Sequence, residues 1–318
     1  LNLIRLLLFK PQLPIAMAKS QIRTSRSPLI LKLKFLLLAW LHRDRRNSRV
    51  QILEHISYRD LKSATDGFRR IITVDPQGTT YEAKFQDGSL SVVREVMVNQ
   101  GVEVFYKEML CLARLHHRHI VALRGYSVGH RRFLIFKGTA HGSLKEHLND
   151  PLRTPLNWRN RVQIAIGVAA ALEYLHRFCD PPISSVSISS SDIILDEKLT
   201  PKLSNISCHC SEGLRVKASE QSKERKDLIL HQFGTLMLEL ITGQSSINES
   251  TDLMQLIDES PLNISMDNLI DPDLGNSYNF KELRSLLALA RLCMKTKNKS
   301  TFSISHVFLY LQKAFDKT

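Results

Sequence analysis

Ile183 to Asp196 reads Ile-Ser-Ser-Val-Ser-Ile-Ser-Ser-Ser-Asp-Ile-Ile-Leu-Asp, and Lys202 to Ser207 reads Lys-Leu-Ser-Asn-Ile-Ser. These two stretches decide how the chain is read. In both of them, apolar residues alternate with short polar side chains. Their meaning depends on the elements that the sequence predicts on either side.

A long helix is predicted immediately before the first stretch, over Trp158 to Phe178. Apolar and small residues recur there at the spacing of one helix face, namely Val162, Ala165, Ile166, Ala169 and Leu172. A second helix is predicted near the start of the readable sequence, over Ile56 to Phe68. Gly67 would end that helix, because glycine adopts the left-handed conformation common at helix C-termini.

Two strands are predicted between these helices, over Tyr81–Phe85 and Leu90–Val98. The Asp87-Gly88 pair that separates them is a hairpin signal. The apolar run Phe133–Phe136 predicts a further strand, and Ser143 is a suitable N-cap for a helix that follows it.

Together these segments resemble the kinase domain of plant receptor-like kinases. Trp158–His176 is similar to W-x-x-R-x-x-I-A-x-x-x-A-x-x-L-x-Y-L-H, Leu115–Gly125 to L-x-H-R-N-L-V-x-L-x-G, and Ile56–Phe68 to F-S-Y-x-E-L-x-x-A-T-x-x-F. The resemblance continues through Phe233–Gly243 and ends near Phe315.

The resemblance implies an α+β fold of the bilobal protein-kinase type. A small, mainly β lobe with one helix is expected over residues 56–136, and a larger α-helical lobe over residues 137–318. The activation segment is expected to be shortened, because no Ala-Pro-Glu anchor lies between Ser207 and Asp227. The buried Arg that pairs with this anchor in the family is replaced near Thr301, so both halves of that ion pair are lost together.

The two opening stretches then correspond to the catalytic frame of the family, which carries His-Arg-Asp, Lys and Asn in the first and Asp-Phe-Gly in the second. Ser187 stands at the base position, Ser189 at the Lys position and Asp192 at the Asn position, while Asn205 replaces the metal-binding Asp. Serine has no carboxylate to accept a proton, and a neutral amide is a weak ligand for magnesium. No catalytic residue and no metal site are therefore expected, with a cation held by Asp192 alone as the alternative.

The nucleotide-binding side of the frame is equally altered. Of the three glycine positions in the phosphate-binding loop, only Gly78 is glycine, which favours an ordinary turn between strands. Arg94 replaces the strand Lys, and Arg is a poor substitute for a point charge. Gly78, Arg94, Glu108 and Asp192 are interpreted as remnants of a nucleotide pocket, with Arg94 and Glu108 forming a structural ion pair.

The function predicted from this pattern is that of a pseudokinase, a signalling scaffold or partner-binding module without a cofactor. Its expected partner is a protein, an active receptor-like kinase, at the cytoplasmic side of the plasma membrane or in the cytoplasm. Two alternatives stay open: an ATP- and magnesium-dependent serine/threonine kinase with unusual chemistry, and a truncated receptor kinase product without function.

The formal net charge of +13 is concentrated in residues 1–50, which hold eleven Lys or Arg and one Asp. This distribution argues against nucleic acid as a partner of the folded part. The segment 1–50 is interpreted either as a degraded membrane anchor with its basic flank or as a basic tail that contacts anionic lipid, with a cleaved targeting sequence as a third option.

Five cysteines without framework spacing indicate a reducing compartment. A zinc site at Cys208-His209-Cys210 is not expected, because tetrahedral zinc needs four ligands. The three His of 116–119 are expected around a turn and not as a metal site.

Overall fold

The structure is a computed structural model. It describes residues 53–75, 78–97, 101–138, 141–179, 182–183, 185–208, 218–244, 270–275, 277–295 and 302–315. The segment 1–50, which was interpreted as a membrane anchor, a lipid-contacting tail or a targeting sequence, lies outside these residues. Within the described part, no helix is both long and apolar enough to cross a membrane.

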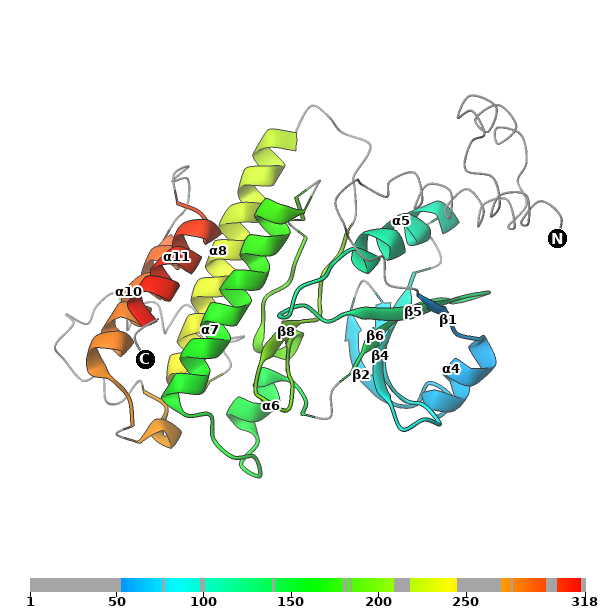
Figure 1. Cartoon of the computed structure of the whole chain (residues 1–318), viewed down its shortest axis with the longest axis horizontal. Coiled ribbons are helices and arrows are strands. Elements are labelled where there is room, and N and C mark those ends of the chain that lie inside the picture. The colour runs from blue at the N-terminus through cyan, green and yellow to red at the C-terminus, as the bar shows by residue number, and fades with distance from the viewer. Residues whose placement is uncertain are drawn as a thin grey trace, which may run out of the picture. The chain divides into compact units, whose positions relative to one another are not determined.

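The first lobe is built on a six-stranded sheet with strand order β1-β5-β6-β4-β3-β2 (Figure 1). All neighbouring strands are antiparallel except β1 and β5. The strands are β1 (Glu54–His55), β2 (Ile71–Asp75), β3 (Gly78–Lys84), β4 (Leu90–Val96), β5 (Leu123–Val128) and β6 (Arg132–Lys137). The helix between β1 and β2, α4 (Tyr58–Ala64), shares one core with the sheet. This core includes Leu61, Tyr81, Ala83, Val93, Phe133 and Ile135.

The predicted β3–β4 hairpin is confirmed. Asp87 Oδ1 accepts hydrogen bonds from the backbone N and the hydroxyl of Ser89, and Gly88 has a positive φ of 79°. This turn chemistry fixes the β3–β4 register, in which Arg94 of β4 lies opposite Thr80 of β3.

The first helix is shorter than predicted. α4 spans Tyr58–Ala64, with Ser57 as its N-cap, and the chain turns away at Thr65. Asp66, Gly67 and Phe68 all have positive φ, so the helix ends before Gly67 and not at Phe68. The Thr65 hydroxyl, which donates to the Leu61 carbonyl and accepts from the Phe68 backbone N, stabilises this early exit.

The second lobe is mainly helical. α7 (Trp158–Glu173) and α8 (Ala218–Thr242) lie side by side, α10 (Phe280–Lys295) packs on α8, and α11 (Ile304–Phe315) packs on α7 (Figure 1). The predicted helix over Trp158–Phe178 is corrected at its end, where Tyr174–Phe178 forms a π-helical turn. The stretch that carries the resemblance through Phe233–Gly243 forms the C-terminal part of α8, which begins at Ala218 and ends at Thr242.

A buried ion pair ties these helices together. Arg161 of α7, 1% exposed at its side chain, donates to Asp271 Oδ2 at 2.6 Å. The same guanidinium donates to the carbonyls of Leu156 and Leu240. Arg161 therefore connects α7 to the end of α8 and to the segment at residue 271.

Candidate functional site

The two stretches quoted at the outset lie against each other. β7 (Ile193–Leu195) and β8 (Pro201–Leu203) form a short antiparallel pair that brings them together. Beyond this pair, Ser187 N donates to the Asn205 carbonyl at 3.2 Å, and Ser207 N donates to the Ser185 carbonyl at 2.9 Å. We refer to Ser185–Asp192 as the serine loop.

Asp192 is the centre of the hydrogen bonds within the serine loop. Its Oδ2 accepts from the hydroxyls of Ser187 at 2.8 Å and Ser189 at 2.7 Å. Its Oδ1 accepts from Asn205 Nδ2 at 3.1 Å. The residues at the base, Lys and metal-ligand positions of the family are thus three neutral donors that share one carboxylate.

The predicted ion pair between Arg94 and Glu108 is confirmed. Arg94 Nη2 lies 3.0 Å from Glu108 Oε1, and the two side chains are 11% and 3% exposed. Arg94 Nη1 also donates to the Ile206 carbonyl at 3.3 Å, and the Ser207 hydroxyl donates to Glu108 Oε1 at 3.4 Å. The pair therefore joins β4 and α5 (Val102–Ala113) to the segment that follows Asn205.

Gly78 lies in a tight connection between β2 and β3. Asp75 and Gly78 are cross-strand partners, so only residues 76 and 77 separate the strands, and they lie outside the described residues. A Cβ at Gly78 would lie 2.1 Å from the Glu95 carbonyl oxygen. The close approach of β4 alone is enough to require glycine at this position.

Sequence reasoning missed how the remaining polar groups pair. The bonds from Asn205 to Asp192 and from Ser207 to Glu108 join residues that lie far apart in the sequence. The replacement of the family's metal-binding Asp by Asn205 indicated only the loss of a metal ligand, and not a new hydrogen bond. Only the residue types could have indicated this pairing. The carboxylate of Asp192 needs hydrogen-bond donors, and the nearby serines and Asn205 can supply them.

The three His residues lie in the turn that was predicted for them. The His117 ring stacks on Tyr174, with ring centroids 5.0 Å apart, and its Nδ1 accepts from the backbone N of His119. Burial lowers the pKa of His117 to about 4, aided by the nearby His119 and Arg118. Burial also lowers the pKa of His119, whose Nδ1 lies 3.0 Å from the Pro201 carbonyl oxygen.

Metal ligands are not grouped in the part of the chain that the structure describes, where no three His, Cys, Asp or Glu side chains could jointly hold an ion. Cys208 is buried and has a free thiol. His209 and Cys210, which follow Cys208 in the stretch where no zinc site was expected, lie outside the described residues, as does Thr301.

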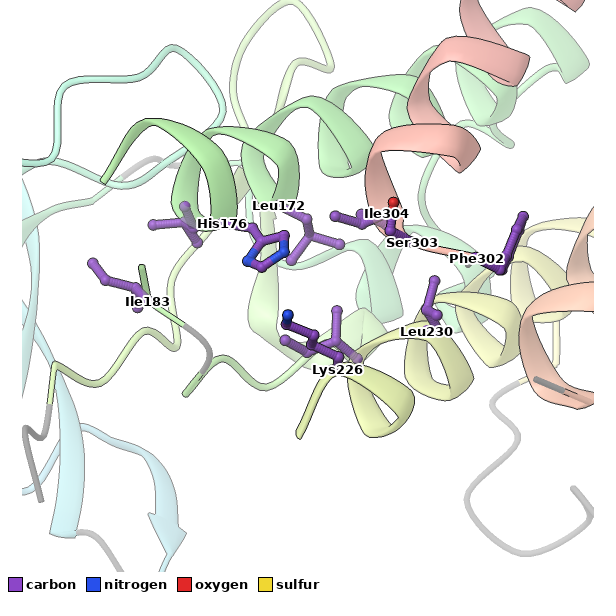
Figure 2. A pocket seen from close by; sticks show the side chains of 10 residues that line it. Leu172, His176, Ile183, Lys226, Leu230, Phe302, Ser303 and Ile304 are labelled. Atoms are coloured by element: carbon purple, nitrogen blue, oxygen red, sulfur yellow. The ribbon is translucent and has the colours of Figure 1, made fainter. Parts of the chain in front are cut away.

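A small pocket lies between α7, α8 and the start of α11 (Figure 2). Its lining is mostly apolar, with His176 and Lys226 as polar members, and includes Leu172, Leu230 and Phe302. The cavity volume of about 40 Å³ has room for a few water molecules. This volume is well below the roughly 300–1,000 Å³ of pockets that hold small-molecule ligands.

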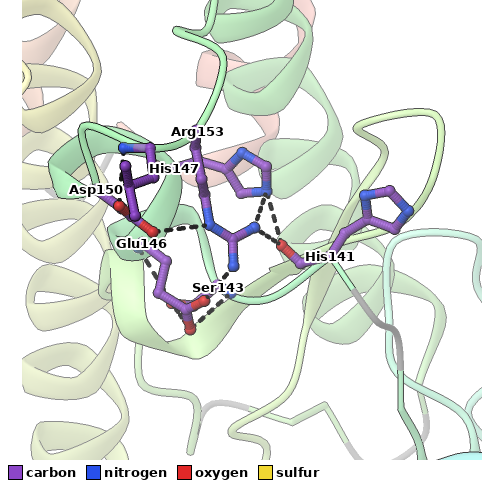
Figure 3. A network of polar contacts seen from close by, with 7 residues as sticks. His141, Ser143, Glu146, His147, Asp150 and Arg153 are labelled. Carbon is purple, nitrogen blue, oxygen red and sulfur yellow. Dashed lines mark hydrogen bonds and ion pairs between the residues drawn. The ribbon is translucent and has the colours of Figure 1, made fainter.

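A polar network fixes α6 (Leu144–Asn149), the helix that follows β6 (Figure 3). Ser143 caps α6 as predicted, in a reciprocal capping box with Glu146. Arg153 donates to Glu146 Oε2 at 2.7 Å and to the His141 carbonyl, and burial lowers the pKa of the neighbouring His147. These contacts stabilise the helix start and are structural.

Residues 79–208 match the model of a family described as protein tyrosine and serine/threonine kinase. A probable receptor-like protein kinase of Arabidopsis thaliana is 33% identical over an alignment of 288 residues, and the match covers 82% of this chain and 43% of that protein. The calcium/calmodulin-regulated receptor-like kinase 1 of the same plant is 32% identical over an alignment of 264 residues, and the match covers 76% of this chain and 59% of the relative. The chain thus spans about half the length of these curated relatives.

Among solved structures, the chain is similar to the pseudokinase domain of BIR2, described as an immune regulator of the RLK/Pelle family. The sequences are 25% identical, the TM-score is 0.72, and the match covers 88% of this chain and 92% of that one. The two-lobed arrangement of a sheet lobe and a helical lobe is common to both.

Proposed function

Because this chain belongs to the plant receptor-like kinases, we propose that its kinase domain transfers no phosphate and acts as a protein-binding module in signalling. The observation that carries the proposal is the closed set of hydrogen bonds at Asp192. Ser187, Ser189 and Asn205 hold this carboxylate between them. None of the three supplies the carboxylate that accepts a proton or the carboxylate that binds magnesium in phosphoryl transfer.

The residues fit Mg·ATP poorly in this proposal. Both Asp192 oxygens already accept hydrogen bonds, and a cation would have to displace the neutral donors from them. The family uses a Lys at the Arg94 position, which pairs with the helix Glu and contacts phosphate. The pair with Glu108 is kept here, but the larger guanidinium also donates to the Ile206 carbonyl and is a poor substitute for the Lys point charge. Of the three glycine positions in the loop that covers the phosphates in active kinases, only Gly78 is kept, and the close approach of β4 already requires glycine there.

Radiolabelled phosphate transfer tests the loss of activity. The full chain is incubated with labelled ATP and magnesium, alone and with a generic protein substrate, beside an active receptor-like kinase domain. We expect incorporation at the background level, because the base and the metal ligand are replaced together. Incorporation that disappears in the Arg94→Ala variant would instead support the alternative of an active kinase with unusual chemistry.

The proposed partner is an active receptor-like kinase, and the proposed location is the cytoplasmic face of the plasma membrane or the cytoplasm. Support comes from the relatives, which are named receptor-like kinases, and from BIR2, whose pseudokinase domain belongs to an immune regulator. The basic segment 1–50 is proposed to contact anionic lipid. Co-sedimentation of the full chain with vesicles that contain phosphatidylserine, compared with neutral vesicles, tests this contact.

A further inference from the structure

The six-stranded sheet has two outer strands, and they differ in how well they resist pairing with another chain. β1, at one edge, spans only Glu54 and His55. β2, at the other edge, has five residues, and its strand neighbour in the described part of the chain is β3 alone. A long outer strand leaves a row of backbone N–H and C=O groups open, whereas a very short or charged one does not. The β2 edge is therefore the one that can accept a further strand.

The side chains of β2 add apolar surface to this open edge. Ile71 is 55% exposed, Ile72 is 52% exposed and Val74 is 72% exposed. All three are β-branched, as is Thr73, and β-branched residues favour strand pairing. Lysine and proline, which protect outer strands in other sheets, do not occur within β2. A register shift against β3 between Ile71 and Thr73 gives partial protection, and Val74, the most exposed of the three, lies beyond it.

The charges at the two ends of β2 are complementary to those of a second copy. Arg69 and Arg70, both exposed, precede the strand, and Asp75 is its last residue. When two copies of one strand pair antiparallel, the start of each lies beside the end of the other. The two arginines of one copy then lie near Asp75 of the other. Parallel pairing would instead place like charges side by side, which is unfavourable.

We propose that β2 is a self-association surface, on which a second copy of this chain pairs its own β2 in the antiparallel direction. The two sheets join edge to edge across a two-fold axis that passes close to Thr73. Such a contact is self-complementary and closed, so association stops at the dimer. Two five-residue strands form a small contact compared with the roughly 1,000 Å² of a stable interface, so the dimer is weak and forms only in concentrated solution. The contact does not depend on whether the domain transfers phosphate.

Sedimentation velocity of the full chain, from low micromolar to near-millimolar concentration, tests the proposal. We expect the average mass to rise towards that of a dimer. Val74→Lys places a charge on the open edge and should abolish the rise. Leu152→Lys, the matched control, replaces a leucine that is 93% exposed in the turn after α6, and should dimerise as the parent does. A parent chain that stays monomeric throughout, or a dimer that Val74→Lys leaves intact, would overturn the proposal.

An exchange of charges tests the antiparallel direction separately. Arg69→Asp and Asp75→Arg should each weaken the dimer, because each brings like charges closer together, and the double variant should recover it. A double variant that dimerises no better than the two single variants would contradict the pairing. Thermal unfolding at low concentration shows whether each variant is folded. If Val74→Lys does not fold, the charge exchange still decides the outcome.

Discussion

At the scale of single residues, Asp192 explains why the serine loop stays ordered without its catalytic groups. A carboxylate in a partly buried loop needs donors, and Ser187, Ser189 and Asn205 supply them. The replacements therefore complement one another, because each neutral side chain bonds the same acceptor.

Restoring a carboxylate at residue 187 should disturb this arrangement. In Ser187→Asp, a second carboxylate would lie beside that of Asp192, in place of the hydroxyl that now donates to Asp192 at 2.8 Å. Like charges at this separation raise the pKa of one member, and we expect a loss of about 1–3 kcal/mol in unfolding free energy at pH 7. Urea unfolding at pH 7 and pH 5 measures the change.

The loss caused by Ser187→Asp should shrink at pH 5, since the folded pair then shares a proton. Ser187→Ala, the matched control, removes one hydrogen bond and should cost about 0.5–1.5 kcal/mol at both pH values. Equal stability of Ser187→Asp and the parent chain at pH 7 would argue against the hydrogen bonds described at Asp192.

His117 should make the fold sensitive to acid. Burial lowers its pKa from 6.5 to about 4 in the folded chain, so the unfolded chain binds more protons between these values. The stabilisation from neutral His117 is complete above pH 6.5 and is lost as the pH falls towards 4. Melting temperatures recorded across this range should fall more steeply for the parent than for His117→Phe, which keeps a ring to stack on Tyr174. Identical slopes would contradict the assignment.

At the scale of elements, the side chain of Arg161 holds α7 against the end of α8 and against Asp271. Arg161→Ala would leave Asp271 as an unpaired buried carboxylate, and we expect a loss of about 3–5 kcal/mol. Arg177→Ala, the control, breaks a pair with Glu173 whose Arg side chain is 65% exposed and should cost about 0–1 kcal/mol. Chemical denaturation of both variants gives the comparison, and equal losses would contradict the structural role of Arg161.

The elements also show what the sequence could predict. The β3–β4 hairpin and the α6 cap follow from local residue chemistry, since Asp87-Gly88 and Ser143 act within a few residues of themselves. The end of α4 did not follow, because the Thr65 side chain competes for the helix carbonyl and the chain turns earlier than Gly67. The π-helical turn after Glu173 has no signal in the apolar spacing either.

The site was predictable only as a set of positions. Ser187, Asp192 and Asn205 were placed in the catalytic frame by resemblance, and the structure brings them together. That the side chains of Ser187 and Asn205 both donate to Asp192 depends on the meeting of two stretches, which no local pattern encodes.

At the scale of the whole molecule, the proposed binding role requires a stable helical lobe more than an intact cleft. Leu172 of α7 and Leu238 of α8 are buried in the core, and each is 3% exposed. Truncation of either to Ala should cost about 2–5 kcal/mol and should reduce partner capture from plant membranes. Ser187→Asp, though less stable at pH 7, should still bind the partner when it is folded. Pull-downs in which the core variants bind fully and only Ser187→Asp fails would show that the cleft itself is the binding surface.

The central claim is that the serine loop and Arg94 no longer form a site for magnesium and ATP. Thermal unfolding of the full chain tests this claim most directly. The melting temperature is recorded while Mg·ATP is raised to millimolar concentration, with magnesium alone as the reference. A ligand present at 100 times its dissociation constant would add about 2.7 kcal/mol to the unfolding free energy, which is a visible shift. We predict no magnesium-dependent rise at any concentration, whereas a saturable rise that Asn205→Asp strengthens would contradict the account.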